Sequence, residues 1–391
     1  MRRSALYLLG LAVTILVALG LVVLSSASEV RSIRICGKPW YFVTRQLLFI
    51  ALGIFSAVGV ALMDYHRWKD RRWMSIGLAA LVFLAPCAVF LFPAIKGSHR
   101  WIPLPGGISV QPSEVAKLAT VVLVSVWLDR IGWKVELLLH GAVYPGLLIG
   151  FFALPVILEP DFGSFMVIGL VGLMLMFVAG TRILHLGPIA LLAAGIGIWK
   201  IMHNANRMAR LGPFIAAVAS FLGLGGDMDA QMDDPAAYQA NQSVIAIRRG
   251  GLLGVGIGRS MQKQNYLPEA WTDFIFAVGA EEMGLVFSAT VIIVFCAFFG
   301  LCIYIARKAP DRFGRLLVIG MSAIVFFQAM FNIGVVCKAL PTKGMALPFF
   351  SYGGTNMVTS FVAVGFIFSV GLRALKEKDT KRSLGRKAFA N

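Results

Sequence analysis

Four carboxylates lie within fourteen residues of a chain in which only 14% of the residues are charged. They are Glu269, Asp273, Glu281 and Glu282, and the run from residue 274 to 306 is long and apolar enough to cross a bilayer. Because Pro268 disfavours a helix through this region, we expect a spanning helix to begin close to Asp273. A helix N-terminus stabilises an anion, and an ionisable residue at a membrane boundary is a candidate functional group. We therefore take Asp273 as the candidate catalytic residue, with a simple helix cap as the alternative.

The composition predicts an all-α, polytopic membrane protein. Of 391 residues, 58% are hydrophobic, and the mean hydropathy of +0.80 is too high for a soluble globular protein. We expect a single domain over 1–372, with a large extracytoplasmic loop at 203–273 and a disordered basic tail at 373–391. Apolar runs of spanning length predict ten helices, at 5–25, 41–63, 73–92, 113–128, 138–158, 163–180, 183–201, 274–306, 316–336 and 356–372.

Basic residues are distributed unevenly between the two ends of these helices. If the N-terminus is inside, more than half of the 36 Lys and Arg residues fall in cytoplasmic segments, many of them in the tail. The positive-inside rule then places both termini in the cytoplasm. The sequence pI of about 10.0 therefore indicates contact with anionic membrane lipids and not with nucleic acid.

Several common kinds of site are not predicted. The five cysteines show no CxxC spacing and no pairing with histidine, so neither a metal site nor a disulfide framework is expected. The glycine-rich segment 254–258 lacks the flanking strand and helix of a dinucleotide site, and we expect a flexible turn there.

Ionisable and polar side chains from many segments fall at the outer membrane face in this topology. Acids and bases at one depth suit an amphiphile that carries phosphate and hydroxyl groups, because cations bind phosphate and carboxylates bind or deprotonate hydroxyls. An ion-coupled transporter would place its charges near the midplane instead. The candidate substrate-binding residues are Arg45, Arg100, Trp101, Glu114, Lys117, Asp161, Arg207, Arg210, Gln242, Lys263, Glu269, Lys343 and Ser351.

Three of these assignments have alternatives. Glu114 and Lys117 are three residues apart on one helix face, so they either line a cavity or form a buried ion pair that joins two helices. Arg45 either binds phosphate or extends to the lipid headgroups. The glycines after Ser351 either let the backbone approach a ligand or form a plain turn before the last helix.

Six motifs, in order along the chain, resemble the SEDS family (shape, elongation, division and sporulation). They are GSHRW, QPSEVAKLA, EPDFGS, YQANQS, LPEAWTDFIFAVGAEEMG and LPTKGMALPFFSYGG. The resemblance implies a ten-helix glycosyltransferase that polymerises lipid II into peptidoglycan at the outer face of the bacterial cytoplasmic membrane. It also implies a class B penicillin-binding protein as partner. The LPTKG and YLPEA forms resemble the division branch more than the elongation branch, which implies further divisome partners and a place at the septum.

The same resemblance implies roles for individual residues. The essential aspartate of the family's TDF element corresponds to Asp273, and polar groups of its outer cavity correspond to Arg45, Glu114 and Lys117. One departure is Trp271, where the family more often has histidine. This substitution concerns contacts with the acceptor and not the class of reaction.

The reaction implied by the resemblance is an inverting displacement at a sugar carbon. It requires one base and a stabilised pyrophosphate leaving group. Asp273 is the candidate base, and Arg45, Lys117, Lys343 or a divalent cation (Mg²⁺ or Mn²⁺) would neutralise the pyrophosphate. No other cofactor is expected. The alternatives are a lipid II flippase and a non-catalytic scaffold for the penicillin-binding protein.

Overall fold

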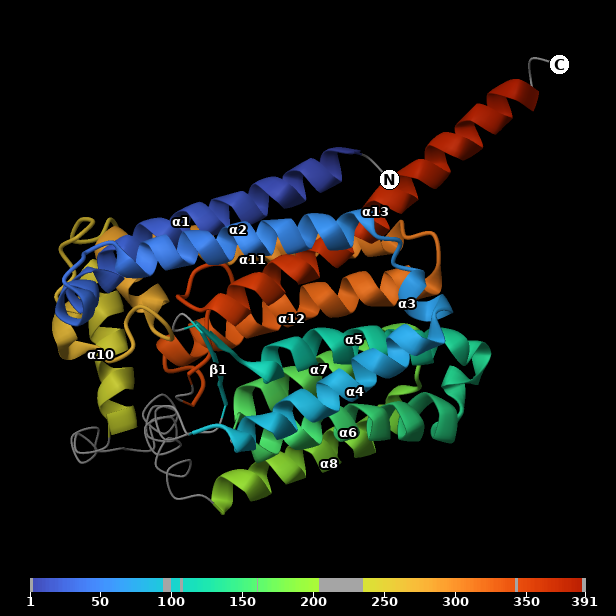
Figure 1. Ribbon diagram of the computed structural model, residues 1–391, viewed down its shortest axis with the longest axis horizontal. Coiled ribbons are helices and arrows are strands. Elements are labelled where there is room, and N and C mark those ends of the chain that lie inside the picture. Colours follow the sequence, from blue (N-terminus) through green and yellow to red (C-terminus); the bar gives the residue numbers. More distant parts are fainter. Residues whose placement is uncertain are drawn as a thin grey trace.

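The fold is a bundle of long helices with a short hairpin and an additional helix at one end (Figure 1). The computed structural model describes residues 3–93, 100–105, 108–159, 161–203, 235–341 and 344–388. The long helices are α1 (Arg3–Cys36), α2 (Tyr41–Leu62), α4 (Arg72–Ala88), α5 (Pro112–Arg130), α6 (Tyr144–Leu158), α7 (Phe162–Ala179), α8 (Ile183–Met202), α11 (Ile275–Arg307), α12 (Arg312–Val336) and α13 (Gly354–Ala388).

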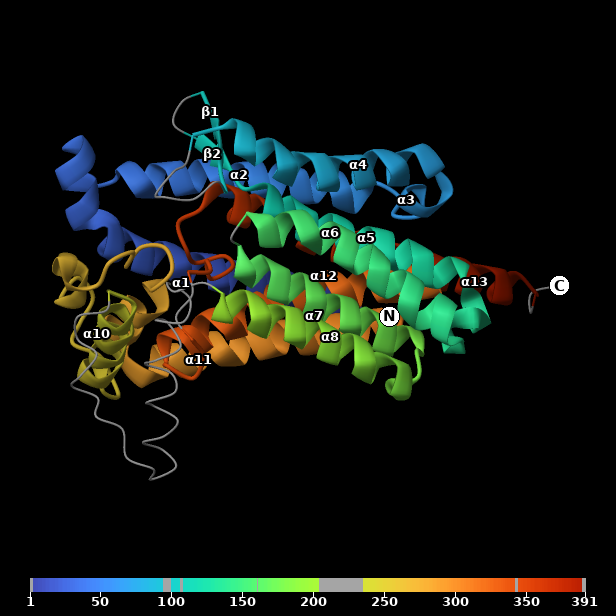
Figure 2. The same cartoon turned by 90° about the horizontal axis from the view of Figure 1, so that it is seen from below.

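Shorter elements connect these helices. Strands β1 and β2 pair antiparallel between α4 and α5, with Pro103 opposite Ser109. Figures 1 and 2 both place α10 at one end of the bundle, with the two chain termini towards the other end. The short elements are α3 (Arg67–Asp70), η1 (Val89–Leu91), β1 (Ile102–Leu104), β2 (Ile108–Val110), η2 (Gly132–Glu136), η3 (Leu138–Val143), α10 (Pro235–Gly250) and η5 (Gln262–Tyr266).

Nine helices among the described residues are long and apolar enough to cross a membrane, which confirms the predicted all-α membrane class. The expected span at 113–128 is helix α5, which is not one of the nine. Helix α5 begins with Pro112 at its first position and carries Glu114 and Lys117 in its first two turns. It lies inside the bundle against α4, α7 and α12, so neighbouring helices surround its charges. The predicted total of ten spans stays a prediction.

The core of the bundle centres on α12, whose apolar stretch is 72% buried and packs against α5, α7, α11 and α13. Helix α8, by contrast, is only 6% buried over its apolar stretch. A spanning helix that is apolar on every side but covered on few has its remaining surface available to lipid. The buried polar side chains of α12, namely Ser322, Gln328 and Asn332, are therefore surrounded by neighbouring helices.

Two features of the helices differ from simple expectation. Helix α11 is interrupted at Gly284, which has a φ of 72°. The turn after α10 is hydrogen-bonded there, with Val255 N–H donating to the carbonyl of Glu281 at 3.0 Å. The predicted disordered tail is wrong for most of its length, because α13 continues to Ala388. Lys, Glu, Arg and Leu are strong helix formers, so a helix that leaves the bundle has no local reason to stop there.

Candidate active site

Asp273 lies two residues before the start of α11. Helix α11 packs against α10, which lies at one end of the bundle (Figure 1). The N-cap of α11 is Phe274, whose side chain forms no capping hydrogen bond. Glu269 begins the turn before the helix with a φ of 56°, which is rare for a residue with a side chain. Thr272 stabilises this turn by donating its hydroxyl to the Glu269 carboxylate at 3.0 Å. Asp273 is therefore placed by a strained turn and is not the N-cap.

The loop between α12 and α13 packs directly against Asp273. A Cβ at Gly344 would lie 2.2 Å from Oδ2 of Asp273, so any larger residue there would displace the Asp273 carboxylate. Asn332 of α12 donates from Nδ2 to the backbone carbonyl of Asp273 at 2.7 Å and to that of Met345 at 2.6 Å. The backbone of the loop is thus fixed next to the candidate base.

Ser351 extends this connection along the same loop. Its buried hydroxyl donates to the carbonyl of Thr272 at 2.5 Å and accepts from the N–H of Leu347 at 2.7 Å. The carbonyl of Ser351 accepts from Gln46 of α2 at 3.0 Å. Because both hydrogen bonds of the hydroxyl are made within the protein, Ser351 positions the turn before α11.

Aromatic side chains surround the turn on the side of α2. Trp271 stacks on Phe42 with ring centroids 6.2 Å apart, and the guanidinium of Arg31 lies 5.4 Å from the Trp271 ring. Arg45 donates to the Tyr41 hydroxyl at 2.8 Å and lies over the same ring. The structure therefore brings Arg45 to the same end of the bundle as Asp273, on a platform of aromatic rings.

Glu114 and Lys117 form a buried ion pair, with Lys117 Nζ 2.8 Å from Glu114 Oε1. Their side chains are 9% and 2% exposed, respectively. Lys117 also donates to Gln328 Oε1 of α12 at 2.5 Å, and Thr359 of α13 donates to Glu114 at 3.4 Å. The pair therefore joins three helices, which matches the predicted alternative of an ion pair that joins helices.

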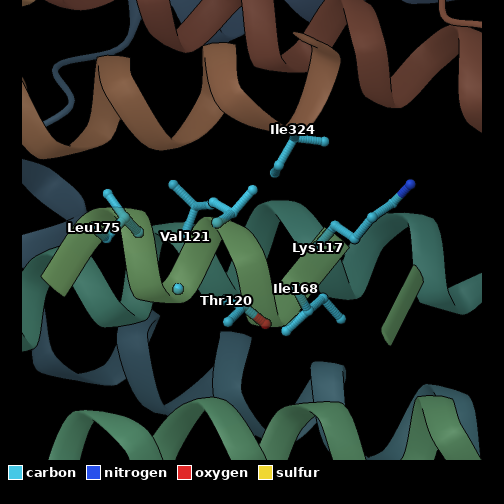
Figure 3. Close-up of a pocket in the computed structure, with 8 residues that line it drawn as sticks. Lys117, Thr120, Val121, Ile168, Leu175 and Ile324 are labelled. Carbon is cyan, nitrogen blue, oxygen red and sulfur yellow. The ribbon is translucent and has the colours of Figure 1, made fainter. Parts of the chain in front are cut away.

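Cavities next to this pair are small. One, shown in Figure 3, lies between Lys117 and apolar side chains of α5, α7 and α12, including Val121, Ile168 and Ile324. Another, of about 10 Å³, lies between Glu114, Gln328 and neighbours, and has room for about one water molecule. Both are too small for a lipid headgroup, so substrate contact by Lys117 or Glu114 requires these helices to move apart.

Asp161 caps α7 and holds the start of α5. Its Oδ1 accepts from the N–H of Ser164 at 3.3 Å, and its Oδ2 accepts from Ser113 at 2.8 Å and Gln111 at 2.9 Å. The side chain is buried, and these contacts explain its place in the fold. Ser113 and Asp161, far apart in the chain, thus fix two helix starts relative to each other.

Glu159, two residues earlier, is fully buried at the end of α6. Neither carboxylate oxygen has a hydrogen-bond partner among the described residues. Burial raises the pKa of Glu159 to about 9, the charge of Asp161 adds to this increase, and Arg100 opposes it. Glu159 is therefore neutral in the folded protein at neutral pH.

We expect Glu159→Gln to stabilise the protein at pH 8 and to have little effect at pH 5. In the unfolded chain the Glu159 carboxyl loses its proton near pH 4.5, whereas in the folded protein it keeps its proton up to about pH 9. The contribution of Glu159 to the free energy of unfolding is thus highest below pH 4.5, where both states are protonated. It falls by up to about 1.4 kcal/mol per pH unit as the pH rises from 4.5 to 9. Thermal unfolding in detergent measures this, with Glu136→Gln, an exposed carboxylate, as control. Equal effects at both pH values would contradict it.

Lys263 lies in a second buried group of charges, between η5 and α11. Its Nζ is 3.5 Å from Glu282 Oε1 and donates to Ser26 of α1 at 2.8 Å. Glu281 accepts from the N–H of Met261 at 3.2 Å and pairs with Arg249 at 3.3 Å. Two of the four carboxylates singled out in the sequence therefore hold the segment after α10 against α11 and are not near solvent.

The remaining predicted substrate-binding residues lie in α10, before β1 or outside the described residues. Gln242 is half-buried on α10, and Arg100 and Trp101 lead into β1. Arg207, Arg210 and Lys343 lie outside the described residues. Within the described ranges, no three His, Cys, Asp or Glu side chains converge as metal ligands, so the structure assigns no protein ligands to Mg²⁺ or Mn²⁺.

Three buried amides belong to the site but were not predicted, namely Gln328, Asn332 and Asn356. Gln328 and Asn332 are 3% and 1% exposed and lie four residues apart on α12. An available signal was their position inside an otherwise apolar span, since buried polar groups in a membrane are costly unless they have partners.

Sequence comparison identifies the family. The model of the FtsW/RodA/SpoVE cell cycle proteins matches residues 6–375. The chain belongs to this family. A Coxiella burnetii protein named probable peptidoglycan glycosyltransferase FtsW is 37% identical to this chain, over 91% of this chain and 93% of the relative. A Nitrosococcus halophilus protein of the same name is also 37% identical, over 97% of this chain and 95% of the relative. The predicted resemblance to the SEDS family, and to its division branch, is confirmed.

Solved structures support the same fold. The present chain superimposes on a component of a peptidoglycan synthase complex with a TM-score of 0.72. The two are 23% identical over 94% of this chain and 97% of that one. The present chain also superimposes on the rod shape determining protein RodA of Thermus thermophilus with a TM-score of 0.64 and 21% identity, over 93% and 95%. At these identities the likeness concerns the fold.

Proposed function

We propose that this protein is a peptidoglycan glycosyltransferase that polymerises lipid II at the outer face of the bacterial cytoplasmic membrane, at the division septum. Membership of the family and the names of the FtsW relatives support the activity. The single observation that carries the site is the placement of Asp273. It lies at a helix start, outside the apolar span, in a strained turn held by the loop before α13.

In the proposed reaction, the 4-hydroxyl of N-acetylglucosamine in one lipid II attacks the anomeric carbon of N-acetylmuramic acid at the end of the growing chain. Asp273 accepts the hydroxyl proton as the new C–O bond forms. The bond from the anomeric carbon to undecaprenyl pyrophosphate breaks on the opposite face, which inverts the configuration. The leaving group carries away the bonding electrons as negative charge.

Cations at the same end of the bundle would stabilise that charge. Arg45 lies over the Tyr41 ring and donates to its hydroxyl, and the planar fork of a guanidinium matches the geometry of phosphate oxygens. Lys343 adjoins Gly344, which packs on Asp273, so it is the second candidate. Lys117 is neutralised by Glu114. We therefore assign it to holding α5, α12 and α13 together.

A class B penicillin-binding protein is the proposed partner, with other divisome proteins around the pair. One structural relative is part of a complex that coordinates polymerization and crosslinking. Helices associate in a bilayer through close side-chain packing, and this chain has lightly buried helices such as α8 available for such contacts or for lipid.

The test is polymerisation of lipid II by the purified protein with and without its class B penicillin-binding protein. We expect glycan strands with the partner and little product without it. Translocation of lipid II across vesicles without any polymer would favour the flippase. Polymer formation that depends only on the partner's own active site would favour the scaffold. Either result would contradict the proposed function.

A further inference from the structure

The loop that packs on Asp273 is held by two amide side chains of a single helix face. Asn332 Nδ2 donates to the carbonyls of Asp273 and Met345 at 2.7 and 2.6 Å. Gln328, four residues earlier and hence on the same face of α12, donates from Nε2 to the carbonyl of Ala346 at 3.0 Å. Successive carbonyls of the loop are therefore bound by successive turns of α12.

Asn332 connects two segments that would otherwise be independent. One of its donor contacts is to the turn before α11 and the other is to the loop before α13. Its Oδ1 has no hydrogen-bond partner among the described residues, so the side chain acts there as a donor. Without it, the carbonyls of Asp273 and Met345 would each lose a hydrogen bond in a buried position.

Gln328 connects the same loop to the buried ion pair. Its Oε1 accepts from Lys117 at 2.5 Å, while its Nε2 also donates to Asn356 Oδ1 at 2.9 Å. Lys117 in turn pairs with Glu114. The amide oxygen of Gln328 therefore bonds to α5, and its amide nitrogen bonds to the loop and to α13.

We infer that Asn332 and Gln328 are positioning residues, which hold the 344–347 backbone against Asp273 and so set the location of its carboxylate. This inference rests on the proposed role of Asp273 as the base. The loop also lies close to the carboxylate itself, because a Cβ added at Gly344 would overlap Asp273 Oδ2. A displacement of about 1 Å at a reacting group can reduce turnover by about 10²-fold.

The first test compares Asn332→Ala with Ser322→Ala in the complex of full-length protein and penicillin-binding protein. Ser322 is also a buried polar residue of α12, but it bonds to the carbonyl of Ile319, about three turns from the loop. We expect Asn332→Ala to lower kcat about 10- to 100-fold, with the KM for lipid II changed less than about threefold because the phosphate-binding cations are untouched. Asn332→Ala should lower the Tm more than Ser322→Ala, because it removes two hydrogen bonds between segments and Ser322→Ala removes one within the helix.

The second test separates the two functions of Gln328. Gln328→Glu keeps an acceptor for Lys117 but removes both donors, whereas Gln328→Met removes acceptor and donors together. If the loop contact matters, both variants lose turnover. Normal turnover in Gln328→Glu with loss in Gln328→Met would overturn the inference for Gln328, because only the Lys117 contact would then count.

The third test uses Asp273→Asn as background. A residue that acts through Asp273 has nothing left to position there, so adding Asn332→Ala should change the residual rate less than about threefold. Equal losses in both backgrounds, or a loss in Asn332→Ala no larger than in Ser322→Ala, would overturn the inference while leaving the proposed base intact. Near-normal polymer from Asp273→Asn alone would instead overturn the proposed base.

Discussion

Replacing Asp273 with asparagine is expected to lower glycan synthesis by about 10²- to 10⁴-fold, the usual contribution of a general base. Asparagine keeps the shape of aspartate but cannot accept the hydroxyl proton. Lipid II binding should change far less, since Arg45 is unaltered, and the variant should still assemble with its penicillin-binding protein. The measurement is polymer formed by the purified complex, with a lipid II binding assay on the same sample.

The matched control is Glu269→Gln, in the same turn. Glu269 accepts from Thr272 and shapes the turn, so its replacement should affect stability more than the pH dependence of turnover. Asparagine is itself a good N-cap. If the only role of Asp273 were to stabilise the helix start, Asp273→Asn would therefore leave polymer formation nearly unchanged. Near-normal polymer from Asp273→Asn would remove it as the base and direct attention to Glu269.

Replacing Lys117 with methionine is expected to destabilise the protein by about 3–5 kcal/mol, because Glu114 would be left buried without its cation. Gln328 would lose the same partner. Thermal unfolding should show the loss, and turnover should fall with it. Adding Glu114→Gln should restore most of the stability, since a neutral amide leaves no unpaired charge.

An exposed ion pair supplies the control for this experiment. Arg182 and Glu136 are 3.1 Å apart but 64% and 61% exposed, so Arg182→Gln should change stability by less than about 1 kcal/mol. If Lys117→Met left the Tm unchanged and abolished turnover, the pair would be part of the substrate site and not a structural link. Lost turnover that stays lost in the double variant would have the same meaning.

The class, the family and the approximate position of Asp273 follow from the chain alone. Apolar runs of spanning length are a local property, and so is the proline that keeps a helix from passing through 268. The sequence also showed that Glu114 and Lys117 share a face of α5, and it left open whether they line a cavity or form an ion pair. What was not visible is that α5 lies inside the bundle, since hydropathy describes a segment and not its neighbours.

The partners of each polar side chain were decided only by the tertiary structure. Lys263 and Asp161 were predicted to bind substrate, but the first pairs with Glu282 and the second caps α7. These roles depend on segments that meet only after the helices pack.

For Asn332, too, the partner was decided only by the tertiary structure. Its polar side chain in an apolar span was visible in the sequence, but its bond to Asp273 joins residues 59 positions apart. Spacing along a chain determines which residues share a helix face. Contacts between faces are determined by how the helices pack, and in this protein the candidate active site consists largely of such contacts.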